Sequence, residues 1–455
     1  MTDFTAIDRY IVDHLDESLA ELVQLCAQPS VSAQGLGIRE CAELVADMLR
    51  RRGFQVEIIA TQGHPIVYAE AEGSSEKTLL LYNHYDVQPP EPLELWDSPP
   101  FQPTFRDGKL YARGVSDDKG HIMCRLAALD ALKAVTGAYP CRIKFVIEGE
   151  EETSSTHLEA FVRENAEKLR ADACIWEFGG VNFEGRPTMT LGMRGICYVE
   201  LSVQTATQDA HSGLGGSIFP NAAWRLVWAL NSLKGPDERI RIPGFYDAVR
   251  PPTPRDLELL AALPDDSAEI LQRYGLKGFL KGLSGGVELQ RAQVFEPTCT
   301  ICGLTAGYQG PGSKTVLPAR ASAKVDFRLV PDQDPEDILG KLRQHLDAEG
   351  SSDVEITYLG GEKPARTDPD HPFVRLALEA AHKAYGKEPV IAPMSGGSGP
   401  NHVFIETLNV PIVTAGVSYP GAQAHAPNEN LVPEHFINGV RHTARILEWF
   451  GRGRG

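Results

Sequence analysis

Residues 141–155, CRIKFVIEGEEETSS, join a short apolar run to a cluster of acidic side chains. The run at 143–147 has the length and the β-branched content of a buried strand. Three adjacent glutamates, Glu150, Glu151 and Glu152, follow it closely. Neighbouring carboxylates repel one another, so this cluster is either a hydrated acidic turn or a group of ligands for a cation.

The strand at 141–148 belongs to a series in which helical and strand patterns alternate. Helical patterns cover 4–26, 37–53 and 119–136, and strand patterns cover 55–60, 66–71, 78–82 and 172–177. Strands separated by such helices indicate an α/β layer with a mainly parallel sheet. A long β-rich stretch begins near residue 188, and the α/β pattern returns after residue 362. We therefore predict an α/β domain of residues 1–187 and 363–455, interrupted by an inserted α+β domain of residues 188–362.

Length and charge narrow the class of protein. The chain has 455 residues, more than one hydrophobic core usually holds, which also favours two domains. A formal net charge of −17 argues against a nucleic-acid partner, because binding to polyanions depends on excess Lys and Arg. The sequence starts without the pattern of a secretory signal, and no apolar run approaches the roughly 18 residues that span a bilayer. We therefore expect no membrane partner and a cytoplasmic location.

The eight cysteines lie mostly in apolar segments, which suits buried thiols in a reducing compartment. Cys299 and Cys302 have CxxC spacing. They lie in a predicted strand, however, where positions i and i+3 point to opposite faces. We therefore expect neither a redox nor a metal role for this pair.

Five places combine histidine or carboxylate side chains with a strand end or a loop. They are His84 with Asp86, Asp117 with Asp118, the glutamate cluster, Glu177, and His425. Each alone has an ordinary explanation, such as a polar turn or a hydrogen-bonded pair. Together they occupy the carboxyl ends of strands, where open α/β sheets bind ligands. Histidines and carboxylates without thiolates suit Zn²⁺, Co²⁺ or Mn²⁺, and this many anionic groups favour two divalent ions over one.

A series of motifs resembles the carnosinase and cytosolic non-specific dipeptidase branch of the di-zinc exopeptidase superfamily. In order, the motifs are NHYDVQP, WDSPPF, RDGKLYARGVSDDKG, EGEEETSS, LGMRGICY, AHSGLGGS, GSKTVLP, FRLVP and the segment around His425. Aminoacylase, acetylornithine deacetylase and glutamate carboxypeptidase are more distant members. The resemblance implies a three-layer α/β catalytic domain with a mainly parallel sheet, interrupted by an inserted α+β lid and dimerisation domain.

The resemblance also implies which residues hold two divalent metal ions, with Zn²⁺ preferred over Mn²⁺ or Co²⁺. His84 and Glu177 would hold one ion, Glu152 and His425 would hold the other, and Asp117 would bridge both. The peptide bond from Asp117 to Asp118 is expected to be cis. Members of the dipeptidase branch usually have aspartate where this chain has Glu177, whereas the carboxypeptidase and deacylase relatives often have glutamate.

Five further residues receive roles from the same resemblance. Glu151 would be the general base that activates the water between the metal ions, and Asp86 would orient His84. His211 would reach into the active site of a partner subunit and stabilise the tetrahedral oxyanion. Arg328 would bind the terminal carboxylate of the substrate, and Ser398 lies in a glycine-rich loop, residues 395–399, that would present backbone groups to it.

These expectations favour the metal-dependent hydrolysis of dipeptides or short peptides by a homodimer assembled through the inserted domain. The alternative enzyme removes an N-acyl group or a carboxy-terminal residue from a modified amino acid. A non-catalytic binding or scaffold protein is a third possibility. The intact set of metal ligands and Glu151 argues against the third possibility, because a scaffold would be free to lose any of them.

Overall fold

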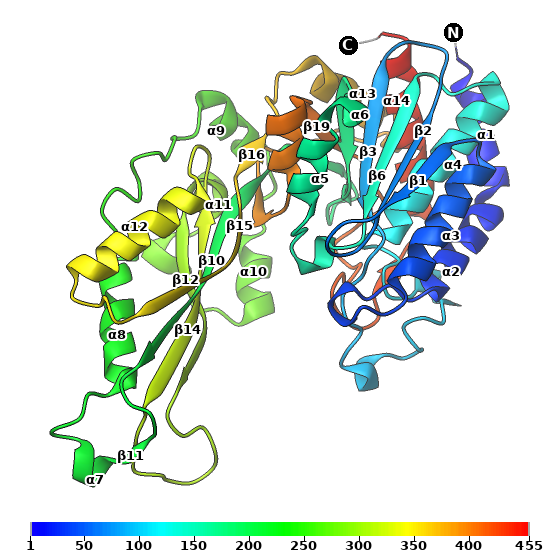
Figure 1. The fold of residues 1–455 in the computed structure, drawn as a ribbon. Coiled ribbons are helices and arrows are strands. Elements are labelled where there is room, and N and C mark those ends of the chain that lie inside the picture. The colour runs from blue at the N-terminus through cyan, green and yellow to red at the C-terminus, as the bar shows by residue number, and fades with distance from the viewer. Residues whose placement is uncertain (1, 454–455) are drawn as a thin grey trace. The chain divides into compact units, whose positions relative to one another are not determined.

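The computed structural model describes residues 2–453 and divides the chain into two compact units (Figure 1). Unit 1 comprises residues 1–192, 366–393 and 400–455, and unit 2 comprises residues 193–365 and 394–399. The sequence pattern predicted the changes of domain at residues 188 and 363. Residues 188–192 belong to unit 1 because strand β9 (Pro187–Thr190) pairs in parallel with β17 (Val390–Ala392). The glycine-rich residues 394–399 belong to unit 2, although they lie far along the chain from its other residues.

Unit 1 contains a six-stranded sheet whose centre is parallel. Its order is β1 (Gln55–Ile59), β2 (Ile66–Ala71), β6 (Arg142–Glu148), β3 (Thr78–His84), β7 (Ala173–Trp176) and β19 (Ile412–Thr414). The strands from β6 to β19 run parallel, whereas β1, β2 and β6 pair in antiparallel fashion. The predicted α/β class is confirmed, with a mixed sheet. The parallel strands bring their carboxyl ends to one edge, where a site is expected.

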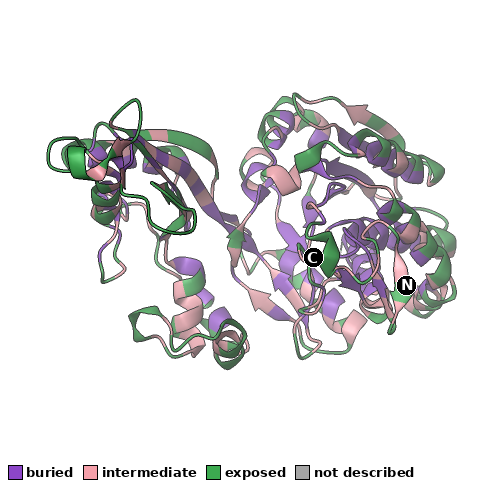
Figure 2. Ribbon diagram, turned by 90° about the horizontal axis from the view of Figure 1, so that it is seen from below, coloured by how far each residue is buried: buried purple, intermediate pink, exposed green. Residues whose placement is uncertain are grey.

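Helices cover both faces of this sheet, which gives unit 1 its three layers. Leu79 and Leu81 of β3 face one core, and Leu80 and Tyr82 face the other, as the alternation along a strand requires. The first core includes helices α1 (Phe4–Asp13), α2 (Leu15–Ala27), α3 (Ile38–Arg51), α4 (Lys119–Thr136), α13 (Pro372–Tyr385) and α14 (Pro433–Gly451). The second core includes α5 (Leu158–Glu164), α6 (Ala166–Leu169) and the π-helical segment η5 (Val403–Leu408). Figure 2 shows the sheet strands and the inward sides of these helices buried.

Two helix boundaries have clear local causes. The helix predicted over 4–26 is divided at His14, whose φ of −109° and ψ of 19° leave the helical region. The His14 ring stacks on Tyr10, and its Nδ1 lies 3.0 Å from the Tyr10 carbonyl oxygen. Helix α4 ends at Gly137 with a φ of 85°, a left-handed conformation that favours glycine.

Unit 2 is built on an antiparallel sheet in the order β12 (Thr298–Ala306), β14 (Arg320–Leu329), β10 (Gly192–Gln204) and β15 (Glu355–Glu362). Helices α8 (Ala222–Leu233) and α12 (Pro335–Ala348) pack on the face that carries Val199, Val325 and Phe327. Intermediate and exposed side chains occupy the other face. Cys299 is buried and Cys302 is exposed, as expected for opposite faces of β12.

Residues 250–297 form helices that the sequence analysis did not predict. They are α9 (Pro254–Ala261), α10 (Ser267–Tyr274) and α11 (Gly286–Phe295). Leu260, Val294 and Phe295 form a small core with Met394, which anchors the glycine-rich strand β18 (Ser395–Ser398) within unit 2. These helices have short apolar stretches, and their patterns are weak in the sequence.

The remaining elements are short. They are η1 (Ser32–Gln34), η2 (Leu93–Leu95), β4 (Thr104–Arg106), β5 (Lys109–Tyr111), η3 (Glu151–Thr153), β8 (Gly180–Val181), β11 (Ala210–His211), α7 (Ser212–Gly215), η4 (Leu280–Gly282), β13 (Val316–Leu317), β16 (Ala365–Arg366) and β20 (Asn430–Leu431). Within residues 2–453, every helix is too short or too polar to cross a membrane.

Candidate metal centre and active site

The polar side chains that the sequence singled out in unit 1 come from the ends of neighbouring elements. His84 ends β3, and Glu177 follows β7 directly. Glu151 and Glu152 form the start of η3, just after β6, and Asp117 lies two residues before α4. His425 lies in the loop between β19 and β20. The segments that carry His84, the two glutamates, Glu177 and His425 therefore lie at or follow the carboxyl ends of four adjacent strands, at one edge of the sheet. Asp117 reaches the same edge from the loop before α4.

Asp117 lies between the two histidines. Its Oδ1 is 3.1 Å from Nε2 of His84, and its Oδ2 is 2.9 Å from Nε2 of His425. Burial alone would raise the pKa of Asp117, but the hydrogen bonds from His425 and His84 outweigh burial and lower it. Hydrogen bonds to Asp117 and Glu152 raise the pKa of His425 to about 10. Protonated histidines thus balance the negative charge of these carboxylates. Divalent cations bound between the same side chains would replace those protons and balance the charge instead.

Each histidine also approaches a second carboxylate. His84 Nε2 lies 3.6 Å from Oε2 of Glu177, and His425 Nε2 lies 3.2 Å from Oε2 of Glu152. The residues thus form two groups, one around each histidine, with Asp117 common to both. The peptide bond between Asp117 and Asp118 is cis, as the resemblance predicted.

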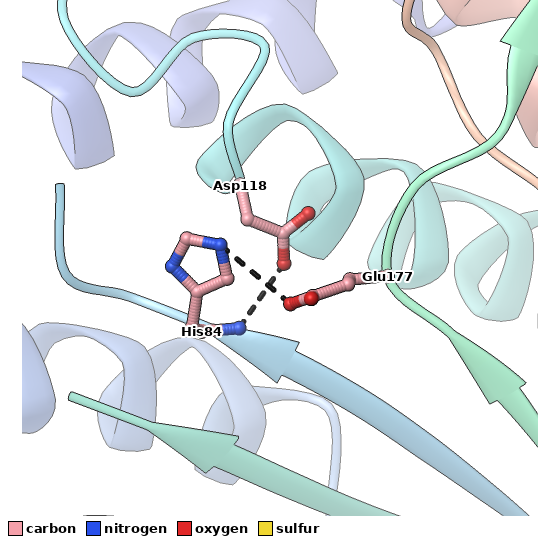
Figure 3. Close-up of side chains that lie close together, drawn as sticks. All are labelled: His84, Asp118 and Glu177. Atoms are coloured by element: carbon pink, nitrogen blue, oxygen red, sulfur yellow. Dashed lines mark hydrogen bonds and ion pairs between the residues drawn. The ribbon is translucent and has the colours of Figure 1, made fainter. Parts of the chain in front are cut away.

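Asp118 also lies close to His84 and Glu177, within the separation that a metal ion could bridge (Figure 3). One of its oxygens, Oδ2, is already engaged by hydrogen bonds from the protein. Oδ2 accepts hydrogen bonds from Nδ2 of Asn83 at 2.7 Å and from the backbone N–H of His84 at 3.1 Å, and Oδ1 lies 2.9 Å from Nδ1 of His121. We therefore interpret Asp118 as an anchor for the end of β3, and Asp117 as the carboxylate available to cations.

The surroundings of the Glu177 carboxylate indicate whether a metal ion fits this pocket. The side chain is completely buried, and among residues 2–453 neither carboxylate oxygen has a hydrogen-bond donor. Burial, and next the negative charge of Glu151, raise the pKa of Glu177 well above its usual value. A buried carboxylate without a donor is costly, whereas a divalent cation would satisfy both oxygens. The pocket therefore fits metal ions better than it fits an empty acidic cleft.

Asp86 connects His84 to the glutamate cluster. Its carboxylate accepts hydrogen bonds from the backbone N–H groups of Glu151 at 3.2 Å and Glu152 at 3.0 Å. Nδ1 of His84 lies 3.0 Å from the backbone carbonyl oxygen of Asp86 and 3.4 Å from its Oδ1. The carbonyl of Asp86 thus orients the imidazole, while the carboxylate mainly holds the backbone that carries Glu151 and Glu152. The expected contact between the Asp86 carboxylate and His84 is present, but at 3.4 Å it is longer than the hydrogen bonds from Glu151 and Glu152 to the same carboxylate.

The acidic cluster quoted from the sequence divides into side chains with different surroundings. Glu148 is buried, and burial raises its pKa to about 8 although Tyr82 and Ser155 donate hydrogen bonds to it at 2.5 and 2.9 Å. Glu150 lies 2.8 Å from Nδ1 of His157. Glu152 faces His425, and Nε2 of Gln88 donates to its Oε2 at 2.9 Å.

Within the described residues 2–453, the side chain of Glu151 has no such hydrogen-bond or ion-pair partner. Burial raises the pKa of Glu151 well above its usual value, the charge of His84 opposes this rise, and Glu152 and Asp117 add to it. A carboxyl group with a raised pKa beside a cation pocket is suited to accept and return a proton.

Sequence comparison places this arrangement in a family. Residues 80–449 match the profile of peptidase family M20/M25/M40. The chain belongs to this family. The Cys-Gly metallodipeptidase dug1 of Schizosaccharomyces pombe is 28% identical over 452 residues, covering 94% of each chain. The Beta-Ala-His dipeptidase of Homo sapiens is 27% identical, covering 95% of this chain and 90% of the human protein.

A solved structure supports the same family membership. The M20 family metallo-carboxypeptidase of Sulfolobus solfataricus has a TM-score of 0.92 and 37% identity, and the match covers 96% of this chain and 99% of that chain. The relatives of this M20-family peptidase therefore include proteins named as dipeptidases and as a carboxypeptidase. Membership also confirms the resemblance on which the sequence-based ligand assignments rest.

Unit 2 of this M20-family chain brings together Arg328 and Ser398, two residues that the sequence predicted to bind substrate. Nη1 of Arg328 donates to Oγ of Ser398 at 2.8 Å, and this hydroxyl donates to the carbonyl oxygen of Gly195 at 3.0 Å. Arg194 donates from Nε to the Gly396 carbonyl at 3.0 Å, which holds the glycine-rich loop from its other side. Burial, and next the charge of Arg328, lower the pKa of Arg194 to about 10. The loop is thus fixed beside Arg328.

His211 is exposed at the end of β11, where its Nδ1 accepts a hydrogen bond from the backbone N–H of Gly213 at 3.0 Å. Its ring is therefore held at the start of α7, on an exposed part of unit 2. An exposed His211 is compatible with a contact to a partner subunit, and the role of His211 in a partner's active site stays a prediction.

Sequence reasoning missed one buried carboxylate that organises the M20-family site. Oε2 of Glu429 accepts hydrogen bonds from Nη1 of Arg113 and the N–H of Gly114, both at 2.8 Å. Oε1 accepts from the N–H groups of Ser116 at 2.8 Å and Asp117 at 3.0 Å. Glu429 stands between asparagines in a loop, a composition typical of solvated turns. Only the position of this glutamate shortly after His425 could have signalled its role.

Proposed function

We propose that this M20-family peptidase hydrolyses the amide bond of dipeptides or short peptides with the help of two divalent metal ions, Zn²⁺ before Mn²⁺ or Co²⁺. The observation that carries the proposal is the position of Asp117 between two histidines. One of its oxygens faces His84 and the other faces His425. Each of these histidines also approaches one further carboxylate. His84 and Glu177 would hold one ion, His425 and Glu152 the other, and Asp117 both. When bound, such a pair supplies an acidified water and a Lewis acid for the scissile carbonyl.

The residues of the chain would then carry the proton. Glu151 takes the proton of the attacking water and returns it to the leaving amine, which avoids a free amide anion. Asp86 holds Glu151 for this task through the backbone N–H. Arg328, with a free edge of its guanidinium and with Ser398 beside it, binds the carboxylate of the substrate. His211 of a partner subunit stabilises the oxyanion of the tetrahedral intermediate.

The test is Glu151→Gln, which keeps the size of the side chain and removes its ability to accept a proton. We expect turnover of a dipeptide to fall by about 10²–10⁴-fold or more while elemental analysis still finds the metal ions. Glu159→Gln, at an exposed position of α5, is the matched control, with turnover unchanged. Retained turnover in Glu151→Gln would remove Glu151 as the base, and loss of the metal ions would make it a ligand instead.

A carboxypeptidase or an N-acyl-amino-acid deacylase is the second candidate. The 37% identity to a metallo-carboxypeptidase favours it, as does the glutamate at position 177. Purified holoenzyme should be tested against free dipeptides, dipeptides blocked at the amino end, and N-acyl amino acids. Cleavage of free dipeptides alone supports the dipeptidase. Preference for the blocked or acylated compounds supports the second candidate.

The proposal includes a homodimer formed through unit 2. Apolar side chains on α8, Trp224, Val227 and Trp228, are 56%, 42% and 56% exposed, and the rings of the two tryptophans stack on each other. On the edge strand β12, Ile301 and Leu304 are 51% and 54% exposed. Exposed apolar side chains on a helix and on the outer strand of a sheet are typical of a protein–protein contact. A cytoplasmic location is part of the same proposal, supported by cysteines that are free and almost all buried.

A further inference from the structure

A row of side chains crosses the helix-free face of the unit 2 sheet. Thr298 of β12 is directly opposite Arg328 of β14. Ile196 of β10 is opposite Arg328 on one side and opposite Glu362 of β15 on the other. Directly opposed residues of antiparallel strands project to the same face. The alternate residues, Phe327 among them, face the helices. Arg328 and Glu362 therefore lie on one face, two strands or about 9–10 Å apart.

Arg328 retains one edge for a ligand. Its Nη1 donates to Ser398, and its Nε lies 3.5 Å from Oδ2 of Asp326. Among residues 2–453, Nη2 of Arg328 has no hydrogen-bond or ion-pair partner. This is the group that the proposed function assigns to the carboxylate of the substrate.

Glu362 is the unexplained member of the row. Among residues 2–453, no side chain forms a hydrogen bond or an ion pair with its carboxylate. Burial raises the pKa of Glu362 to about 7, although the charge of Arg328 opposes this rise. A half-buried carboxylate without a partner is unfavourable, so the position is suited to receive a cationic group.

The neighbouring position along β15 leaves room for such a group. Gly360, two residues before Glu362, is opposite Tyr198 and shares the face of Glu362. It contributes no side chain, and a Cβ placed there would meet no atom within 4 Å. The space beside Glu362 is therefore open, and it lies on the same face as Arg328.

We propose that Glu362 selects substrates whose carboxy-terminal residue has a cationic side chain, with lysine the best fit. This inference rests on the proposed function, because it takes Arg328 as the group that binds the α-carboxylate. A lysine has a four-carbon stem and an ammonium group, and with a hydrogen bond at each end it spans two strands. An apolar side chain of equal length gains nothing from Glu362, and an acidic side chain is repelled by it.

The experiment compares kcat/KM of the metal-loaded enzyme for Ala-Lys and for Ala-norleucine, which has nearly the same stem without the ammonium. We expect the wild-type enzyme to prefer Ala-Lys by at least about tenfold, the size of one charge-assisted hydrogen bond. Glu362→Gln should reduce this ratio by about tenfold, mainly through KM. Glu362→Lys should move the preference toward Ala-Glu. Glu355→Gln, at the exposed start of the same strand, should leave the ratio unchanged.

The outcomes separate this inference from the proposed function. Hydrolysis of both dipeptides with a ratio that Glu362→Gln does not alter would overturn the role of Glu362 and leave the peptidase assignment standing. If neither dipeptide is hydrolysed, the proposed function fails. Calorimetric binding of free lysine and norleucine to the Glu151→Gln protein then still tests Glu362. Equal affinity for the two amino acids would overturn the inference.

Discussion

The carboxylate of Glu429 accepts a hydrogen bond from the backbone N–H of Asp117, with 3.0 Å between nitrogen and oxygen. Three further donors share this carboxylate, among them the buried guanidinium of Arg113. Glu429 follows His425 in the same loop, and so one side chain ties the loop of a proposed terminal ligand to the loop of the proposed bridging ligand. The backbone that carries Asp117 is therefore held in place by hydrogen bonds within the fold.

Substitution of Glu429 by Gln should weaken both stability and metal binding. The amide would turn a donor toward backbone N–H groups and leave Arg113 without an anion, a change that costs about 3–5 kcal/mol in the free energy of unfolding. Urea denaturation of the metal-free protein measures this loss, and competition with a chelator should show a 10–100-fold lower metal affinity. Glu434→Gln, exposed at the start of α14, is the control. Equal affinities in the two variants would contradict the role of Glu429.

Removal of metal ions should lower the melting temperature, because ions that bind only the folded chain stabilise it by about 2.7 kcal/mol at a free concentration 100 times Kd. The pKa of Glu177 is raised, so protons compete with cations, and metal affinity should fall as the pH falls. Calorimetric scans with and without a chelator measure the stabilisation at each pH. Glu177→Gln should reduce the difference between the two scans. A difference that does not depend on pH would contradict the assignment of Glu177 as a ligand.

His442 should make the metal-free protein sensitive to mild acid. It is buried in α14, where Nε2 donates to the Ala377 carbonyl at 2.9 Å. Burial, helped by the charges of Arg125 and Arg445, lowers the pKa of His442 from 6.5 to about 4. A lowered pKa means that the unfolded chain takes up the proton first. The stabilisation is therefore present above pH 6.5 and is lost as the pH falls toward 4, by up to about 3 kcal/mol.

The measurement is urea denaturation of chelator-treated protein at several pH values between 7 and 4. His442→Gln keeps a donor for Ala377 without a group that titrates, and it should flatten the dependence of unfolding free energy on pH. His382→Gln on the exposed side of α13 is the control for loss of an imidazole. An unaltered slope in His442→Gln would show that other groups cause the acid sensitivity.

A shared active site makes a prediction that only a dimer can meet. His211→Ala chains and Glu151→Gln chains should each be nearly inactive alone. In a mixed dimer, the intact Glu151 of one chain meets the intact His211 of the other, so one of the two sites works. Random mixing should restore about one quarter of wild-type activity. No recovery, with mixed dimers verified by mass spectrometry, would show that His211 does not serve its neighbour.

Much of unit 1 could be predicted from the sequence. Strand β2 and helix α4 begin and end where their patterns do, because strong apolar periodicity and a glycine at 137 define them locally. The candidate ligands could also be found, since each one sits at a strand end or beside a turn. The family resemblance was needed to join them into two groups, because ligands distant in the chain have no common local pattern.

The rest depends on contacts that sequence patterns do not contain. In the sequence, strand β9 looks like the start of the β-rich stretch that continues into unit 2. In the structure, it pairs with β17 in unit 1. The role of Glu429 depends on four donors from a loop some 300 residues away in the chain. The different surroundings of Asp117 and Asp118 were equally hidden, because they depend on the contacts that Asn83 and His121 make with Asp118.

The Asp86 carboxylate, which receives the N–H groups of both Glu151 and Glu152, has a consequence for how such an enzyme could be re-engineered. Any change that shifts the end of β3 would displace Glu151, the proposed base, together with Glu152, a proposed cation ligand. If Glu151 and Glu152 have these proposed roles, metal preference and hydrolytic chemistry depend on the same backbone segment, and a library that alters one of them should include compensating positions around residue 86.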